Sequence, residues 1–276
     1  MQHTIIGLGW LGQSLAEHLS QQGHNVIGTV RQTEKQHVLA NKGVNAHIFD
    51  CYQTLPTSLA STLFEHRNVI ISIAAGRRNL DPHRYIDAIQ NLIDIATASR
   101  CRKIIFISAT SVFADDEAEI TNLTKPKPTS SSGFAHYAIE KYLLSAHQQS
   151  NVLRLAGLVG PNPDKGYRHP IHSLALRSVL SDPSGPVNLI HKQDVISTIH
   201  RLLEQNYDGR AFNLCSHEHP TRVDYYQWCA KQLDLPPLSF VDNDRGSRKT
   251  KRINAKDTLE TLGLTLDFTT PYDMLP

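Results

Sequence analysis

The sequence predicts an α/β protein, a doubly wound parallel sheet with a smaller C-terminal lobe, on three observations. Short β-branched runs alternate with amphipathic helical patterns over residues 1–156. A glycine-rich turn follows the first of these runs, at residues 7–12. After residue 156 prolines and glycines cluster, and the periodic segments become shorter. We therefore expect one domain over 1–156 and a smaller lobe over 157–276, with some elements of the lobe returning to the main sheet.

The strands expected in the first domain are short apolar runs, as strands covered by helices on both faces should be. They cover Thr4–Ile6, Asn25–Val30, Asn45–Phe49, Asn68–Ile73, Lys103–Ser108 and Val152–Leu155. The helices between them have apolar residues at helical spacing and cover Trp10–Gln22, Thr33–Lys42, Pro82–Arg100 and Phe134–His147. Asp81 is the expected N-cap of the long third helix, and Pro82 suits its first position.

The smaller lobe is expected to hold short elements separated by loops. We predict helices near 171–180, 193–205, 222–233 and 255–262, and short strands near 187–190 and 210–214. A local basic run extends from Arg245 to Arg252.

Composition excludes several classes of protein. A net charge of +2 is too small to favour a nucleic acid or an acidic membrane as partner. The apolar stretch from Thr4 to Leu19 is broken by glycines and polar residues, so it resembles neither a membrane span nor a signal peptide. The four cysteines are scattered and the fifteen histidines form no credible metal-ligand pair. We expect reduced thiols, no metal site and a cytoplasmic location.

The glycine-rich turn, Gly7-Leu8-Gly9-Trp10-Leu11-Gly12, has the GxGxxG spacing between a strand and a helix. In this pattern the first glycine permits the tight turn. The second lets the backbone approach a pyrophosphate, and the third lets the helix pack close to the strand. The helix N-terminus then offers free N–H groups to the anion. The turn therefore predicts a Rossmann-type dinucleotide site, formed by residues 7–12.

The end of the second strand indicates which dinucleotide binds. NAD-selective sites place an acidic residue there for the ribose hydroxyls. This chain has Gly28-Thr29-Val30-Arg31 instead. Arg31 could pair with a 2′-phosphate, and Thr29 could add a hydroxyl, so NADP(H) is favoured over NAD(H). The alternative is that Arg31 is a solvated loop residue.

Further cofactor contacts follow from topology, because ligands bind at the carboxyl ends of parallel strands. Asp50 and Cys51 are expected beside the adenine, although Asp50 could equally cap its loop. The other expected contacts follow the fourth and fifth strands: Ala74, Ala75, Gly76 and Ser108.

The catalytic candidates are Tyr137 and Lys141, which form the YxxxK pattern at the start of a helix. Residues four apart share one helical face, so the ammonium lies near the phenol and favours its ionised form. The tyrosine can then act as acid or base, and the lysine can hold the nicotinamide ribose. The alternative is an ordinary amphipathic helix.

Taken in order, these motifs resemble the extended or atypical short-chain dehydrogenase/reductase superfamily, of the NAD(P)-dependent epimerase/dehydratase type. The matching segments are 7–12, 106–114, Tyr137 with Lys141, 154–161, and 188–191 leading to Asp194. The resemblance implies a Rossmann lobe with a C-terminal substrate lobe. It also implies hydride exchange with a nicotinamide, often on a nucleotide-linked sugar.

The chain departs from the family pattern at two positions. Where extended members carry GxxGxxG, this chain has Ile6, and its spacing is similar to the atypical branch, several members of which lack the catalytic tyrosine. The family's catalytic Ser or Thr stands three residues before a valine, and here that residue is Ala109. Ser108, Thr110 or Ser111 could supply the hydroxyl.

The resemblance also implies substrate contacts from the second lobe, by Arg154, Gly157, His191 and Arg252. For His191 the alternative is a helix cap, and for the basic run a solvated loop. The expected function is NADP(H)-dependent hydride transfer on a small carbonyl or nucleotide-sugar-like substrate. The alternative is a catalytically weak or silent NADP-sensing protein. We expect a small-molecule substrate, no nucleic acid or membrane partner, and a monomer or a homodimer that would use the helices near 82–100 and 134–148.

Overall fold

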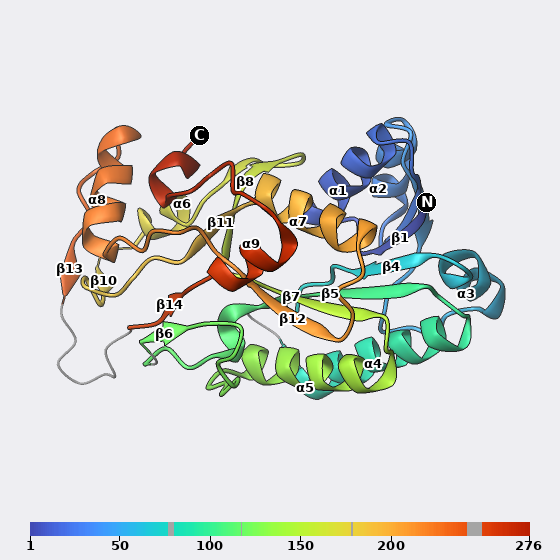
Figure 1. Ribbon diagram of the computed structural model, residues 1–276. Helices are drawn as coiled ribbons and strands as arrows, with labels where there is room; N and C mark the ends of the chain where they lie inside the picture. The colour runs from blue at the N-terminus through green and yellow to red at the C-terminus, as the bar shows by residue number, and fades with distance from the viewer. Residues whose placement is uncertain (77–79, 117, 178, 242–249) are drawn as a thin grey trace.

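The computed structural model describes residues 1–76, 80–116, 118–177, 179–241 and 250–276, and within these ranges seven parallel strands form one central sheet (Figure 1). The strand order is β12-β7-β5-β4-β1-β2-β3. The bounds are β1 (Gln2–Ile6), β2 (Asn25–Val30), β3 (Asn45–Ile48), β4 (Asn68–Ile71), β5 (Lys103–Ala109), β7 (Ser150–Leu155) and β12 (Arg210–Leu214). The predicted doubly wound parallel sheet is confirmed.

Helices cover both faces of this sheet (Figure 1). On one face lie α1 (Trp10–Gln21), α2 (Thr33–Ala40), α7 (Lys192–Glu204) and α9 (Lys256–Leu262). On the other lie α3 (Thr57–Phe64), α4 (Pro82–Ala98) and α5 (Ser131–Ala146). The alternation of strand side chains separates the two cores: Ile105 packs with the first group, and Ile104 with Phe106 packs with the second. β5 is thus buried on both faces.

The sheet order reverses between β1 and β4. The chain runs outward from β1 through β2 to β3, then returns to β4 and continues outward to β5, β7 and β12. At such a switch point the loops after the two central strands diverge and leave a crevice at their carboxyl ends. The glycine-rich turn follows β1 directly and lies at this crevice.

The predicted elements of the first domain are found, with ends shifted by a few residues. Asp81 caps α4 as expected, because its carboxylate accepts a hydrogen bond from the Arg84 amide at 3.1 Å. The helix α3 was not predicted, because it is only eight residues long and rich in Ser and Thr, although Leu59, Ala60, Leu63 and Phe64 recur at helical spacing. The helix predicted over 171–180 ends at Leu174 (α6, Ile171–Leu174). Leu180 of β10 (Leu180–Ser181) pairs instead with β13 (Phe240–Val241).

The second lobe is built around a hairpin and two helices. β8 (Gly157–Asn162) pairs antiparallel with β9 (Gly166–Arg168) and parallel with β11 (Leu189–His191). α6 and α8 (Arg222–Gln232) form a separate core around Tyr225. β12, which follows α7, returns to the central sheet beside β7. A small pair, β6 (Glu119–Ile120) and β14 (Arg252–Ile253), links the lobe to the loop after β5, where the short 3₁₀ helix η1 (Thr110–Val112) lies. A second 3₁₀ turn, η2 (Pro271–Met274), is the last element of the described chain.

Within the described residues, no helix is both long enough and apolar enough to cross a bilayer. All four cysteines are described and are buried free thiols.

A buried ion pair joins α5 to β7 beneath the end of β5. The Arg154 guanidinium donates from Nη2 to Glu140 Oε2 at 2.7 Å, and from Nε to both carboxylate oxygens at 3.1 Å. The Ser108 hydroxyl donates to the same carboxylate at 2.5 Å. Glu140 is 1% exposed and Arg154 is 5% exposed. Because water is excluded, each charge is stabilised by the other.

Histidines from three elements meet at the amino end of the sheet. His3 Nε2 of β1 lies 3.3 Å from His24 Nδ1, and His18 Nε2 of α1 lies 3.1 Å from His200 Nδ1 of α7. Burial, reinforced by the neighbouring His24, lowers the pKa of His3 from 6.5 to about 3. Burial also lowers the pKa of His18 and of His24. Burial therefore favours the neutral forms of His3, His18 and His24.

We expect Glu140→Ala to lower the free energy of unfolding by about 3–5 kcal/mol, because it leaves the Arg154 guanidinium buried and unpaired. Chemical denaturation measures the loss. The double variant Glu140→Ala with Arg154→Leu should recover much of it, since no buried charge remains. A loss below about 1 kcal/mol in the single variant would show that the pair is not a buried one.

We expect the free energy of unfolding to fall as the pH is lowered, because burial disfavours protonation of His3 in the histidine cluster. Between pH 3 and 6.5 the unfolded chain binds more protons at His3 than the folded one does, since the folded pKa is about 3 and the unfolded one 6.5. The free energy of unfolding therefore decreases as the pH falls through this window, by a few kcal/mol. Urea denaturation at several pH values tests this. His3→Gln should flatten the dependence, and identical slopes in both proteins would contradict the assignment.

Candidate active site

The glycine-rich turn has the geometry of a phosphate-binding turn. Gly7 has φ +100°, a conformation that L side chains rarely adopt. A Cβ at Gly12 would lie 2.2 Å from the Gly7 carbonyl oxygen, so α1 starts against the end of β1. A Cβ at Gly9 would meet nothing within 4 Å, which leaves this side of the turn open. The residues present therefore fit a dinucleotide pyrophosphate at the start of α1.

Thr29 serves the turn itself. Its hydroxyl accepts a hydrogen bond from the Gly7 amide at 3.0 Å, and its carbonyl accepts one from the Leu8 amide at 2.8 Å. The Thr29 side chain is buried and fastens β2 to the turn. It is therefore not available to a 2′-phosphate, which differs from the expectation. Leu8 and Leu11 are likewise buried in the core, and they contribute to the turn through their backbone.

The loop after β3 uses Asp50 as a cap. Its carboxylate accepts a hydrogen bond from the Tyr52 amide at 3.1 Å, the local role that was the alternative to an adenine contact. Cys51 is buried, and burial raises the pKa of its thiol to about 11. Both residues lie at the carboxyl edge of the sheet. Cys51 is present as a neutral thiol and not as a thiolate.

Four predicted contacts lie at the expected edge of the sheet. Arg31 is exposed directly after β2. Ala74 and Gly76 are exposed, and Ala75 is half-buried, in the loop after β4. Gly76 has φ +81°, which a side chain would strain. These positions leave Arg31 and the loop after β4 available to a ligand at the crevice.

At the end of β5, Ser108 does not face the side on which the family hydroxyl is expected. Ser108 points toward α5 and donates to Glu140. Successive strand residues face opposite sides, so Ala109 faces away from Ser108, together with Ile107. Ser108 is therefore part of the buried ion-pair network and is not a free catalytic hydroxyl. Within the described residues Ser111, half-buried on η1, has a hydroxyl without a hydrogen-bond partner.

Tyr137 and Lys141 share one face of α5. The Lys141 Nζ atom lies 5.9 Å from the centre of the Tyr137 ring. One turn earlier, a Cβ on Gly133 would lie 2.1 Å from the Ser111 carbonyl oxygen, so the first turn of α5 presses against η1. Tyr137 is half-buried against the apolar cluster that includes Val112, and Lys141 is exposed. The structure thus brings Tyr137, Lys141 and η1 together.

The substrate contacts expected from the second lobe are mostly occupied by other roles. Arg154 is held by Glu140, and its guanidinium lies 5.2 Å from the centre of the Phe113 ring. His191 caps α7 by accepting a hydrogen bond from the Gln193 amide at 3.3 Å and stacks 3.6 Å from Phe268. Burial, and then the adjacent Lys192, lower its pKa to about 4. Both side chains thus have structural partners within the chain, and their expected contacts with a substrate stay predictions.

The two remaining expectations concern Gly157 and the basic run. Gly157 is an exposed residue of β8, and a Cβ there would lie 2.9 Å from the Leu189 side chain. Arg252 is exposed on β14, whereas residues 245–249 of the basic run lie outside the described residues. Asp194, which followed the matching segment, accepts hydrogen bonds from the Asp267 and Phe268 amides at 2.7 and 3.3 Å. Burial raises its pKa to about 6.

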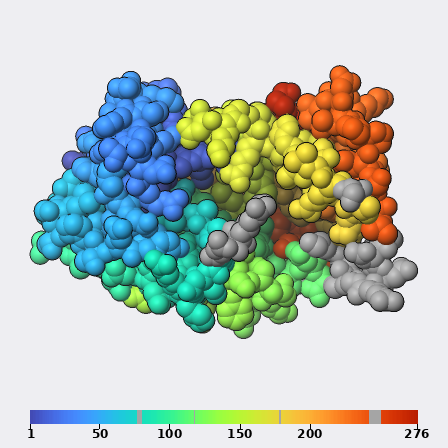
Figure 2. Space-filling model, turned by 180° about the vertical axis from the view of Figure 1, so that it is seen from behind, coloured from blue at the N-terminus to red at the C-terminus, as the bar shows by residue number. Residues whose placement is uncertain are grey.

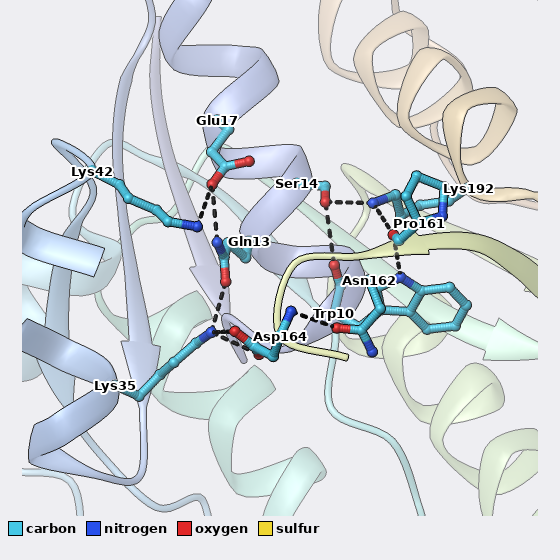
Figure 3. Close-up of polar contacts among 10 residues, drawn as sticks. All are labelled: Trp10, Gln13, Ser14, Glu17, Lys35, Lys42, Pro161, Asn162, Asp164 and Lys192. Atoms are coloured by element: carbon cyan, nitrogen blue, oxygen red, sulfur yellow. Dashed lines mark hydrogen bonds and ion pairs between the residues drawn. The ribbon is translucent and has the colours of Figure 1, made fainter. Parts of the chain in front are cut away.

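The hairpin β8–β9 contacts the glycine-turn helix, which the sequence did not indicate. The Trp10 indole donates to the Pro161 carbonyl at 2.8 Å, and the Arg168 guanidinium lies 4.7 Å from the centre of the Trp10 ring. Lys192, the first residue of α7, donates to the Ser14 hydroxyl at 2.7 Å and to the same Pro161 carbonyl. Figure 3 shows the hydrogen bonds among Trp10, Ser14, Pro161 and Lys192. The partners of Trp10 and Ser14 in these hydrogen bonds are 151 and 178 residues away, so no local pattern could have revealed them.

The hairpin also reaches α2. Lys35 Nζ lies 2.6 and 2.8 Å from the two carboxylate oxygens of Asp164 and 2.7 Å from Gln13 Oε1 (Figure 3). Seen from behind, the yellow chain of the hairpin region abuts the blue N-terminal part (Figure 2). The second lobe is thus attached to α1, the helix that follows the dinucleotide turn, and to α2.

Among solved structures, the chain is similar to a functionally unknown conserved protein from Silicibacter pomeroyi DSS, with a TM-score of 0.76 and 22% identity. That match covers 98% of this chain and 94% of the other. It is also similar to UDP-glucuronic acid 4-epimerase from Bacillus cereus, solved in complex with NAD, with a TM-score of 0.79 and 18% identity over 97% and 94% of the chains. At these identities the likeness shows the fold.

Sequence comparisons extend over the same length. Protein YeeZ from Escherichia coli (strain K12) is 32% identical over 274 residues, 98% of this chain and 97% of that protein. The family model described as "NAD dependent epimerase/dehydratase family" matches residues 4–215, from β1 to the residue after β12. The dinucleotide turn, the Tyr137–Lys141 pair and the central sheet are in place, and the chain belongs to the NAD-dependent epimerase/dehydratase family.

Proposed function

We propose that the protein is an NADP(H)-dependent oxidoreductase, epimerase or dehydratase that acts by hydride transfer on a small carbonyl or nucleotide-sugar-like substrate. The observation that carries the proposal is the placement of Tyr137 and Lys141 on the face of α5 that presses against η1. The family to which the chain belongs is NAD-dependent, and the Bacillus cereus neighbour acts on a UDP-sugar.

A bound nicotinamide would supply the hydride-transfer chemistry at this site. Tyr137 donates a proton to the substrate oxygen during reduction and accepts it during oxidation. Lys141, whose ammonium lies 5.9 Å from the centre of the Tyr137 ring, holds the ribose. Ser111 holds the substrate oxygen, because the hydroxyl of Ser108 is engaged by Glu140, residue 109 is an alanine and Thr110 is buried. The open side of Gly9 and the start of α1 hold the pyrophosphate.

A second candidate function is an NADP-sensing protein with weak or no turnover. Ala109 favours it, because the strand position that carries the family's catalytic hydroxyl offers none here. Tyr137 and Lys141 favour the enzyme. The two functions differ in turnover and not in cofactor affinity.

Cellular location and assembly are also proposals. Four buried free thiols suit a reducing compartment, which supports the cytoplasm. α4 and α5 lie side by side on one outer face, where a second copy could pack to form a homodimer (Figure 1).

We expect Tyr137→Phe to reduce hydride exchange with a panel of carbonyl and nucleotide-sugar substrates at least about 100-fold, because the acid/base group is lost. Cofactor affinity should stay within about twofold of wild type. Tyr142→Phe is the matched control, since that phenol lies on the same helix and donates to Asp94 at the surface. Tight cofactor binding by wild type without turnover on any substrate would support the sensor instead.

Arg31→Ala should weaken NADP binding about tenfold and leave NAD binding unchanged, because a charged contact to the 2′-phosphate is removed. Calorimetric titration of both cofactors measures this. Arg102→Ala serves as control, since Arg102 is an exposed arginine directly before β5, at the opposite end of the sheet. Equal NADP affinity in wild type and Arg31→Ala would remove the assigned role.

A further inference from the structure

The Lys35 ammonium is paired with the carboxylate of Asp164. Both carboxylate oxygens of Asp164 lie within hydrogen-bond distance of Nζ, at 2.6 and 2.8 Å (Figure 3). Asp164 comes from the hairpin of the second lobe, 129 residues along the chain. The third contact of the ammonium is Gln13 Oε1, at 2.7 Å. An acidic group is thus delivered to this ammonium from a distant segment.

Gln13 gives the Lys35 ammonium a defined position. Its side chain is fully buried, and its amide nitrogen donates to Glu17 Oε1 at 2.9 Å, which turns the amide oxygen toward Lys35. Gln13 follows Gly12 directly, so it belongs to the helix that starts at the dinucleotide turn. A lysine held by a buried amide is a fixed positive charge beside α1.

Lys35 also lies close in sequence to the place where cofactor selectivity is decided. β2 ends at Val30, and Lys35 is in the first turn of α2, four residues after Arg31. The adenosine ribose of a bound dinucleotide lies at the carboxyl end of the second strand, next to the glycine turn. Lys35 lies on α2, which follows that strand, and it reaches Gln13 of α1, which follows the glycine turn.

The pair with Asp164 is suited to exchange. The Lys35 side chain is 20% exposed and the Asp164 side chain 47% exposed, so water reaches the pair. Ion pairs at this exposure contribute little to stability. The hairpin keeps a separate attachment through Pro161 to Trp10 and Lys192, so release of Asp164 would free only its tip.

We propose that Lys35 is a specificity-determining residue that binds the 2′-phosphate of NADP(H), and that the Asp164 carboxylate occupies this anion position until the phosphate replaces it. The inference rests on the NADP(H) selectivity of the proposed function. With NAD(H), which has a hydroxyl in place of the phosphate, Lys35 keeps Asp164. The tip of the hairpin is released only by the phosphorylated cofactor.

Calorimetric titration of the purified full chain with NADP, NAD, 2′,5′-ADP and 5′-ADP tests this without any turnover. Lys35→Ala should weaken NADP and 2′,5′-ADP about tenfold and leave NAD and 5′-ADP within about twofold. Asp164→Asn should tighten only the two 2′-phosphorylated ligands, about threefold, because a competing anion is removed. Lys35→Arg should retain most of the selectivity. Lys42→Ala is the matched control, since Lys42 just beyond α2 pairs with Glu17 of α1 at 3.7 Å and should change no affinity.

The outcomes separate this inference from the proposed function. A wild type that binds NAD more tightly than NADP overturns the selectivity on which both rest. A wild type that prefers NADP, with the same preference in Lys35→Ala, overturns the role of Lys35 alone. If Lys35→Ala and Asp164→Asn weaken all four ligands equally, the pair is only a structural link between the lobes, and the proposal is wrong.

Discussion

The close contact between Gly12 and the Gly7 carbonyl is the constraint on which the cofactor site depends. Because a Cβ at residue 12 would lie 2.2 Å from that oxygen, only glycine allows α1 to start against the end of β1. The start of α1 then lies where the order of the sheet reverses, between β1 and β4. Thr29 fastens the same turn to β2. The free amides and the positive end of the helix dipole therefore face one crevice.

The two lobes are joined through helices that border this crevice. α7 is held near both ends: Lys192 at its start bonds to Ser14 of α1, and the Lys103 ammonium of β5 caps its carboxyl end by donating to the Leu202 and Gln205 carbonyls. A cation at the carboxyl end of a helix is favourable, and here it is buried. The second lobe is thereby fixed to the same helix that would bind the phosphates. A change at the start of α1 reaches β8 directly through Trp10, and through Ser14 by way of Lys192.

The sequence was sufficient for the parallel sheet and the dinucleotide turn, because both depend on local patterns. β-branched runs, the glycine spacing and the cap at Asp81 each act within a few residues. The roles of Ser108 and Arg154 were not readable in the same way, since each depends on a partner elsewhere in the chain. The cap that His191 forms is a local contact to Gln193, and it was the alternative that the sequence offered. Ser108 and Arg154 share Glu140, which the YxxxK pattern treats as a variable position. Lys35 was missed for the same reason, because Asp164 lies in a loop-rich segment with no pattern of its own.

The position of the catalytic hydroxyl follows from the alternation of β5. A hydroxyl at residue 109 would point to the side of Ile107, whereas a hydroxyl at 108 points to α5 and meets Glu140. A shift by one residue along a strand therefore cannot replace the family's Ser or Thr. The chain leaves the strand at η1, and there the alternation no longer applies. Ser111 lies on η1 beside the first turn of α5, the helix that carries Tyr137. If the protein is an enzyme, its substrate oxygen has to be bound from this 3₁₀ turn and not from the strand.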